Sequence, residues 1–195
     1  MTGSGRRDPG SGLTPEQQRP PSLAITQASS GEVSPKRPSA AQADAAEEFR
    51  NLRGVDPFGP FIQLLDSPEL MTRVSALGEY LRFRSALPPR LSELAILITA
   101  AHWRQQYEWE IHAPVALQAG IPQATLDALW AGDAPKDLDT EQQALYDLCI
   151  ALHRDRTVFP ALRDRARAAL GEQGAIDAIA ICGYYALLAM VLNSQ

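Results

Sequence analysis

The sequence LSELAILITAAHWRQQYEWEIHAPVALQAG, which spans residues 91–120, decides the fold of this chain. It opens with an uncharged apolar run that is interrupted by one carboxylate, Glu93. A dense polar and aromatic patch follows, and it holds two of the three histidines and two of the three tryptophans between residues 102 and 112. The apolar spacing predicts two successive helices, at about 89–103 and 105–119, with Gly120 as the final stop.

The helical pattern extends over most of the chain. Prolines and glycines mark the ends of the other predicted helices, which cover about 42–53, 68–84, 122–132, 139–153, 160–170 and 173–192, with a short apolar segment over 58–65. Ser67 is the expected N-cap before Pro68, and Asp139 with Thr140 predicts a capping box. No segment alternates with a period of two as strands do. The sequence therefore predicts an all-α bundle of about eight or nine helices.

Residues 1–42 differ in composition from the rest of the chain. They contain no aromatic residue and six of the fifteen prolines. Such a segment cannot bury enough apolar surface to offset the entropy lost on ordering. We predict a disordered tail over 1–42 and one helical domain over 43–195, because 195 residues suffice for one sizeable core but not for two ordinary domains.

Composition also argues against several classes of partner and cofactor. The net charge is −5 without a basic cluster, so nucleic acid is not an expected partner. Cys149 and Cys182 each lie in an apolar helical stretch with no second thiol nearby in the sequence, which is typical of buried free thiols in a reducing compartment. No metal-ligand spacing occurs, so we expect no bound metal. The longest apolar run, 178–192, is shorter than the roughly 18 residues that span a bilayer, and no secretory signal is present, so we expect a cytoplasmic protein without membrane contact.

At its centre the chain resembles the carboxymuconolactone decarboxylase family, which also contains the alkyl hydroperoxidase D-like proteins. Thiol-bearing members show the pattern E-x11-C-x2-C-x3-H. Counting from Glu93, the two cysteine positions and the histidine position fall on Gln105, Glu108 and His112. The run GYYALLAMVLN, 183–193, resembles the closing helix of the decarboxylase-like branch, and the whole resemblance covers roughly 45–193. It implies an alkyl hydroperoxidase D-like fold of the thiol-less branch.

Glu93 and His112 are the candidate catalytic residues. A carboxylate on an apolar helix face can hold or shuttle a proton, and imidazole is the side chain that titrates nearest neutral pH. Without the resemblance, Glu93 could simply complement the helix dipole, and His112 could be a hydrogen-bonded core residue. The resemblance favours a shared acid/base role. It predicts that the two side chains lie within hydrogen-bond or one-water reach of each other.

Four residues are candidates for substrate binding. Trp103 and Tyr107 could line a pocket, although aromatic residues at helical spacing are also common core material. Arg104 could hold a substrate carboxylate with two hydrogen bonds, or it could pair with Glu108 four residues later. Glu108 could place a second carboxylate beside His112, or it could be an ordinary surface acid.

The resemblance implies a cofactor-free decarboxylase or lyase that acts on a small carboxylated lactone or related organic acid through a Glu93–His112 proton relay. Another small-molecule enzyme, and an oligomeric binding or stress-related protein without turnover, stay open. Without the two motif cysteines, thiol peroxidase activity is not expected. Tyr184 or Tyr185 could face the pocket. The last helix is apolar on nearly every face, which predicts self-association, as a trimer or hexamer by the resemblance.

Overall fold

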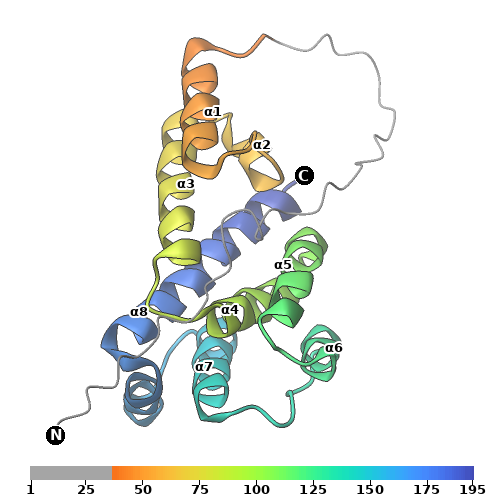
Figure 1. Cartoon of the computed structure of the whole chain (residues 1–195), viewed down its shortest axis with the longest axis vertical. Coiled ribbons are helices and arrows are strands. Elements are labelled where there is room, and N and C mark those ends of the chain that lie inside the picture. Colours follow the sequence, from red (N-terminus) through yellow and green to blue (C-terminus); the bar gives the residue numbers. More distant parts are fainter. Residues whose placement is uncertain (1–36) are drawn as a thin grey trace, which may run out of the picture.

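The computed structural model describes residues 37–195, and within this range the protein is all-α. The elements are α1 (Ala40–Arg53), α2 (Pro60–Leu64), α3 (Pro68–Phe83), α4 (Pro89–His102), α5 (Gln106–Gln118), α6 (Gln123–Ala131), α7 (Thr140–Ile150), the π-helix η1 (Ala151–Asp155) and α8 (Pro160–Asn193) (Figure 1). The predicted helical bundle is confirmed. Most of the predicted tail lies outside the described residues, but Ala40–Gln42 already belong to α1, because Ser39 and Gln42 form a capping box.

Most helix ends follow from the residues that mark them. Gly54 ends α1 with a φ of 70°, a left-handed conformation that glycine adopts without strain. The capping box predicted before α7 is present between Asp139 and Gln142. The expected side-chain cap at Ser67 is absent, since its hydroxyl makes no capping hydrogen bond. Pro68, in the first turn of α3, fixes that helix start instead.

The segment α8 consists of two helices that meet at Gly171. This residue has φ 76° and ψ 164°, which is outside the helical region, and the chain changes direction there (Figure 1). The sequence predicted the same break. By length and composition alone α8 is apolar enough to cross a membrane. Its second part, however, carries most of its buried residues and packs against α2, α3, α4 and α7 as a core helix.

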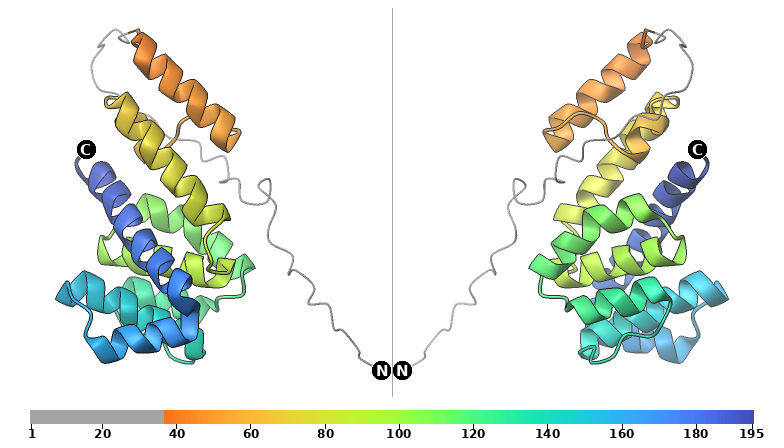
Figure 2. Two further views of the ribbon diagram at one scale, coloured as in Figure 1. Left: turned by 90° about the vertical axis from the view of Figure 1, so that its left-hand side faces the viewer. Right: turned by 90° about the vertical axis from the view of Figure 1, so that its right-hand side faces the viewer.

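Helix α4 is the centre of the domain. Every residue from Leu91 to Ala100 is buried, and the helix contacts α5, α6, α7 and α8 (Figures 1 and 2). A helix that is apolar on all sides must be enclosed in this way. Glu93 and Thr99 are therefore polar side chains on the most deeply buried helix, and each needs a partner within the protein.

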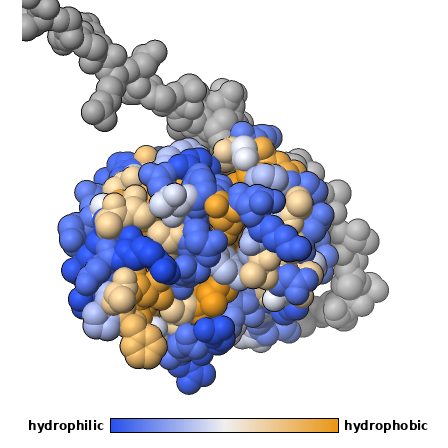
Figure 3. Space-filling model, turned by 90° about the horizontal axis from the view of Figure 1, so that it is seen from below, coloured by the Kyte–Doolittle hydropathy of each residue, from blue (hydrophilic) through white to orange (hydrophobic). Residues whose placement is uncertain are grey.

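At the other end of the molecule, α1 packs on α3, and α2 contacts α3 and α8. Phe49, Phe58 and Phe61 form an aromatic cluster there, with ring centroids 4.7–5.8 Å apart. The opposite end of the molecule, which carries α6 and α7, is seen in Figure 3. Apolar side chains reach its surface in several separate patches between hydrophilic ones.

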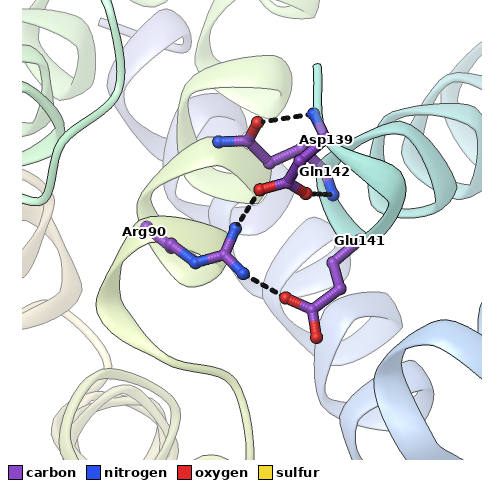
Figure 4. A network of polar contacts seen from close by, with 4 residues as sticks. All are labelled: Arg90, Asp139, Glu141 and Gln142. Carbon is purple, nitrogen blue, oxygen red and sulfur yellow. Dashed lines mark hydrogen bonds and ion pairs between the residues drawn. The ribbon is translucent and has the colours of Figure 1, made fainter. Parts of the chain in front are cut away.

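Polar contacts fix the start of α4 against the start of α7. The Nη1 atom of Arg90 lies 2.7 Å from a carboxylate oxygen of Asp139, and its Nη2 atom donates to Glu141 (Figure 4). Asp139 simultaneously caps α7 through the backbone N–H of Gln142. The first turn of α4, which precedes Glu93, is thus tied to its neighbour by one arginine and two carboxylates.

Candidate functional site

Glu93 and His112 lie together in the interior. The turn formed by residues 103–105, with Arg104 at φ 50°, brings α5 back against α4. The Nδ1 atom of His112 is 2.7 Å from the Oε2 atom of Glu93, and the two residues are only 2% and 6% exposed. A carboxylate on this nitrogen favours the tautomer in which Nδ1 carries a proton, so that Nε2 is directed elsewhere. The predicted proximity of the two side chains is present.

Glu108 approaches His112 from the other side. Its Oε2 atom lies 3.7 Å from Nε2 of His112, one helical turn away on α5. The interpretation of Glu108 as a surface acid is wrong, because the residue is 5% exposed. Burial raises the pKa of its carboxyl group, and Glu93 acts in the same direction, against the lowering effects of His112 and Arg82. The imidazole of His112 is thus flanked by a buried carboxyl group at each ring nitrogen.

Arg82 supplies a positive charge next to Glu108 and His112. Its Nε and Nη2 atoms are shielded from solvent and have no hydrogen-bond partner among residues 37–195. A guanidinium group stays protonated in proteins, and a buried donor without an acceptor costs free energy. Arg82 therefore presents two unpaired donors next to Glu108 and His112. The sequence did not point to Arg82, because it is one of two arginines on α3 and belongs to no motif.

Both tyrosines of the closing helix face this site. The ring of Tyr185 stands edge-on to the imidazole of His112, with centroids 5.1 Å apart at 89°. Tyr184 packs against Gly78 so closely that a Cβ atom there would lie 2.0 Å from the tyrosine oxygen. Burial raises the pKa of Tyr184 to about 12, so its hydroxyl stays protonated. The guanidinium of Arg53 lies beside that hydroxyl.

These side chains surround a cavity of about 20 Å³, which is room for about one water molecule. Its walls come from α1, α2, α3, α5 and α8 and include an arginine pair, two buried acid/base groups, three tyrosines and apolar residues, namely Arg53, Phe58, Pro60, Phe61, Arg82, Tyr107, Glu108, Ile111, His112, Tyr184, Tyr185 and Leu188. The half-buried ring of Tyr107 packs against Gly59, where a Cβ atom would lie 2.5 Å from the ring. Tyr107 thus lines the cavity, as the sequence suggested.

Trp103 and Arg104 are not among the residues that line the cavity. The Trp103 ring packs edge-on against His102, and its carbonyl accepts a hydrogen bond from Asn193. Arg104 is exposed. Its guanidinium donates to the carbonyl of Trp130 and lies 5.7 Å from the centre of that ring. Arg104 therefore neither lines this cavity nor pairs with Glu108.

Gln105 and Glu108 stand at the two motif positions where thiol-bearing members have cysteines, and their surroundings differ. Gln105 is the N-cap of α5: its Oε1 atom accepts a hydrogen bond from the Tyr107 backbone N–H, and its Nε2 atom donates to Asn193 at the end of α8. Glu108 instead faces the cavity beside His112. One position therefore stabilises the helix start, and the other supplies an acid/base group.

The arrangement provides proton donors and acceptors together with one unpaired cation. Glu93, His112 and Glu108 form a continuous row along which a proton can move, provided that substrate or water bridges the longer gap. Arg82 can stabilise negative charge that develops at the cavity. Within residues 37–195, no group of three or more histidine, cysteine, aspartate or glutamate side chains is arranged to hold a metal ion.

One family model matches the part of the chain that holds this cavity's acid/base residues. Residues 68–146 match the model of the carboxymuconolactone decarboxylase family, a range that contains Arg82, Glu93, Glu108 and His112 but ends before α8. Searches of curated proteins and of solved structures found no match. The match over residues 68–146 and the all-α fold support the resemblance of this chain to the carboxymuconolactone decarboxylase family.

Proposed function

We propose that the cavity is the active site of a cofactor-free carboxy-lyase that acts on a small carboxylated lactone or a related organic acid. The observation that carries this proposal is the His112 imidazole, which is held at 2.7 Å by one buried carboxylate and flanked at 3.7 Å by another. Arg82, with two buried donors unpaired, lines the same cavity. Acid/base groups and an available cation are what decarboxylation without a cofactor requires.

The first step of this reaction is the loss of CO₂. As the carbon–carbon bond breaks, its electron pair stays on the substrate and is delocalised onto a neighbouring carbonyl oxygen as an enolate. The unpaired N–H groups of Arg82 can donate to that oxygen as its charge develops. Apolar walls such as Phe61, Ile111 and Leu188 exclude water, which strengthens this interaction.

The second step places a proton on the carbon that has lost CO₂. Glu108 is suited to donate it, because burial raises the pKa of its carboxyl group. Nε2 of His112 then takes up a proton from solvent and passes it to Glu108, while Glu93 holds the ring by its Nδ1–H. One proton is taken up from solvent in each turnover, so the atoms balance.

Substrate binding requires this cavity to open. A small ligand site typically encloses about 300 Å³ or more, whereas this cavity holds about 20 Å³. Tyr107 is the half-buried wall and packs on Gly59, which starts the short helix α2. Outward rotation of the half-buried Tyr107 ring would enlarge the site.

The unpaired donors of Arg82 also support a second candidate function. A protein of this scaffold that binds a small organic acid without converting it, as part of an oligomeric binding or stress-related role, would also keep Arg82 as an anion contact. It would not need a proton relay of three buried groups. The two candidates therefore differ in whether loss of His112 abolishes only turnover or binding as well.

The test is an assay of the purified protein against a panel of carboxylated lactones and β-keto acids, with CO₂ release and proton uptake as readouts. Turnover of one panel member, abolished by His112→Asn with ligand binding retained, supports the carboxy-lyase. Saturable binding of panel members by calorimetry without CO₂ release supports the binding protein. Turnover that is unchanged in His112→Asn would contradict the proposed site.

A further inference from the structure

The two cysteines of this chain lie side by side. They are 33 residues apart in sequence, on α7 and α8, yet their sulfur atoms are only 3.3 Å apart. Both are free thiols, and they are 0% and 3% exposed. Nothing in the sequence predicted this contact, because it arises only from the packing of α7 against α8.

Histidine and threonine side chains accompany only one of the two sulfurs. His153 and Thr99 lie beside Cys182, and the Nε2 atom of His153 is 2.9 Å from the Thr99 hydroxyl oxygen. Since that hydroxyl also donates to the Ala95 carbonyl at 2.9 Å, the His153 nitrogen donates to Thr99. In its ionised form Cys182 accepts a hydrogen bond from the Cys149 thiol, which lowers the Cys182 pKa despite the opposing effect of burial, and His153 and Thr99 lower it further.

The histidine beside Cys182 lies near the protein surface. His153 is half-buried on the π-helix η1, an irregular turn of a kind that occurs often at functional sites. The exposed ring of His102 stacks on it at 4.7 Å and 19°. Cys182 is 3% exposed, whereas Cys149 is 0% exposed, so the sulfur beside the histidine is the one assigned to meet a peroxide first.

We propose that Cys149 and Cys182 form a redox-active dithiol, which a hydroperoxide converts to an intrachain disulfide with Cys182 as the attacking sulfur. This pair is not at the motif positions 105 and 108, and it lies outside the cavity assigned to the carboxy-lyase reaction. It is a second site with its own chemistry.

The reaction proceeds in two balanced steps. The Cys182 thiolate attacks one peroxide oxygen, the O–O bond breaks, and the leaving oxygen takes a proton and departs as an alcohol, or as water when hydrogen peroxide is used. Cys182 is then a sulfenic acid. The sulfur of Cys149 attacks it, an S–S bond forms as the S–O bond breaks, and the hydroxyl leaves with the Cys149 proton as water. Two thiols are oxidised and one peroxide is reduced.

The structure explains why the second step is favourable. The two sulfur atoms must approach from 3.3 Å to about 2.05 Å, the length of a disulfide bond. A displacement of this size is within the reach of side-chain rotation and small helix shifts. The resolving thiol is already in place, so the sulfenic acid has a neighbour that captures it before further oxidation.

The experiment is a titration of the reduced full-length protein with hydrogen peroxide, followed by thiol counting and intact-mass measurement. Since the chain has only two cysteines, the counts are unambiguous. We expect both thiols to disappear with about one equivalent of peroxide, a mass lower by two hydrogen atoms, monomeric chains on a non-reducing gel, and full recovery with dithiothreitol. Thiols that stay unreacted in folded protein but react in denaturant, or disulfides that join two chains, would overturn the proposal.

Variants assign the two roles. Cys149→Ser should stop at a Cys182 sulfenic acid that dimedone traps, and Cys182→Ser should remain reduced. His153→Asn should slow oxidation by at least about tenfold, because the thiolate is the reactive form. A Cys182→Ser protein that reacts at the wild-type rate would contradict the assignment. The wild-type titration stands by itself if a variant fails to fold. The carboxy-lyase proposal is tested separately, by comparing the turnover of the wild type with that of His112→Asn. Failure of one proposal therefore does not affect the test of the other.

Discussion

The Nδ1 atom of His112 lies 2.7 Å from the Oε2 atom of Glu93, across the contact between α4 and α5. This contact fixes the imidazole by the nitrogen that faces the core and leaves Nε2 for Glu108 and the cavity. Glu93 is therefore a positioning residue as much as a proton carrier. The same relationship explains why a carboxylate is found on the most deeply buried helix: its partner arrives from another helix, 19 residues later.

Replacement of Glu93 by glutamine should lower turnover by about 10²-fold or more, since general acid/base groups typically contribute 10² to 10⁴. His112→Asn should cause a similar loss. Both effects should fall on kcat rather than on KM, because neither change removes Arg82. Glu110→Gln is the matched control, since Glu110 is an exposed acid on α5, the helix of His112, and accepts a hydrogen bond from Gln106. Equal losses of turnover in Glu93→Gln and Glu110→Gln would show that Glu93 has no specific role in the reaction.

Glu108 should make the stability of the protein depend on pH. Its pKa is raised above the ordinary value of 4.5, mainly by burial, so the folded state holds this proton more tightly than the unfolded chain does. The resulting stabilisation is fully present below the unfolded pKa and is lost as pH rises through the folded pKa. In the Glu108→Gln protein the side chain at this position is uncharged at every pH, so this stabilisation is not lost as pH rises.

We therefore expect Glu108→Gln to gain stability relative to the wild type between about pH 4 and about pH 8. Urea unfolding of both proteins at the two pH values measures the difference. An unfolding free energy that falls equally in both proteins over this range would show that Glu108 titrates normally.

Much of the fold could be predicted from sequence, because its signals are local. Gly54, Gly132 and Gly171 mark helix ends through their own backbone conformations, and Asp139 caps α7 through a residue three positions away. The apolar run of α4 predicted a buried helix for the same reason. The missing cap at Ser67 shows the limit of such signals, since Pro68 sets the helix start without it.

The site could be predicted only where a pattern of fixed spacing existed. Glu93 and His112 belong to such a pattern. Arg82 does not: its importance comes from the helices packed around α3, which shield two of its nitrogen atoms. The contact between Cys149 and Cys182 was likewise hidden, because it depends on how α7 and α8 pack. For Trp103 and Arg104, nearness in sequence to the motif was a poor guide, since the turn between α4 and α5 directs them elsewhere.

Gly78→Ala should destabilise the protein, although alanine is the better helix former. A Cβ atom at this position would lie 2.0 Å from the Tyr184 oxygen and 2.6 Å from the Arg53 guanidinium. Overpacking of this kind typically costs about 1–3 kcal/mol. Gly183→Ala is the control, because a Cβ atom added there would meet no atom within 4 Å and the residue is exposed on α8. It should be neutral or stabilising by up to about 1 kcal/mol. Thermal unfolding distinguishes the two, and equal shifts would contradict the close packing of Tyr184.

Arg82→Met should weaken binding of carboxylated ligands by about tenfold or more, because the substrate anion loses its cationic contact. The fold should tolerate the change, since methionine removes two buried donors that have no partner. Arg84→Met, which removes an exposed arginine paired with Glu79, is the control and should leave binding unchanged. Calorimetric titration with a carboxylated lactone, in the absence of turnover, measures both variants. Unchanged affinity in Arg82→Met would exclude this arginine as the anion contact.

The protein should form a homo-oligomer, most simply a trimer or hexamer. Ile176 and Ile179 on α8 are 56% and 40% exposed, and Met190, further along the same helix, is 52% exposed. A helix whose other residues form the core would ordinarily present polar side chains to water. Closed symmetry is the usual means by which such apolar side chains are covered. Light scattering should therefore give a multiple of 21.2 kDa at micromolar concentration. Ile176→Asp should shift the mass towards the monomer, whereas Asp127→Asn, an exposed change on α6, should not. A wild-type mass of a single chain would refute this prediction.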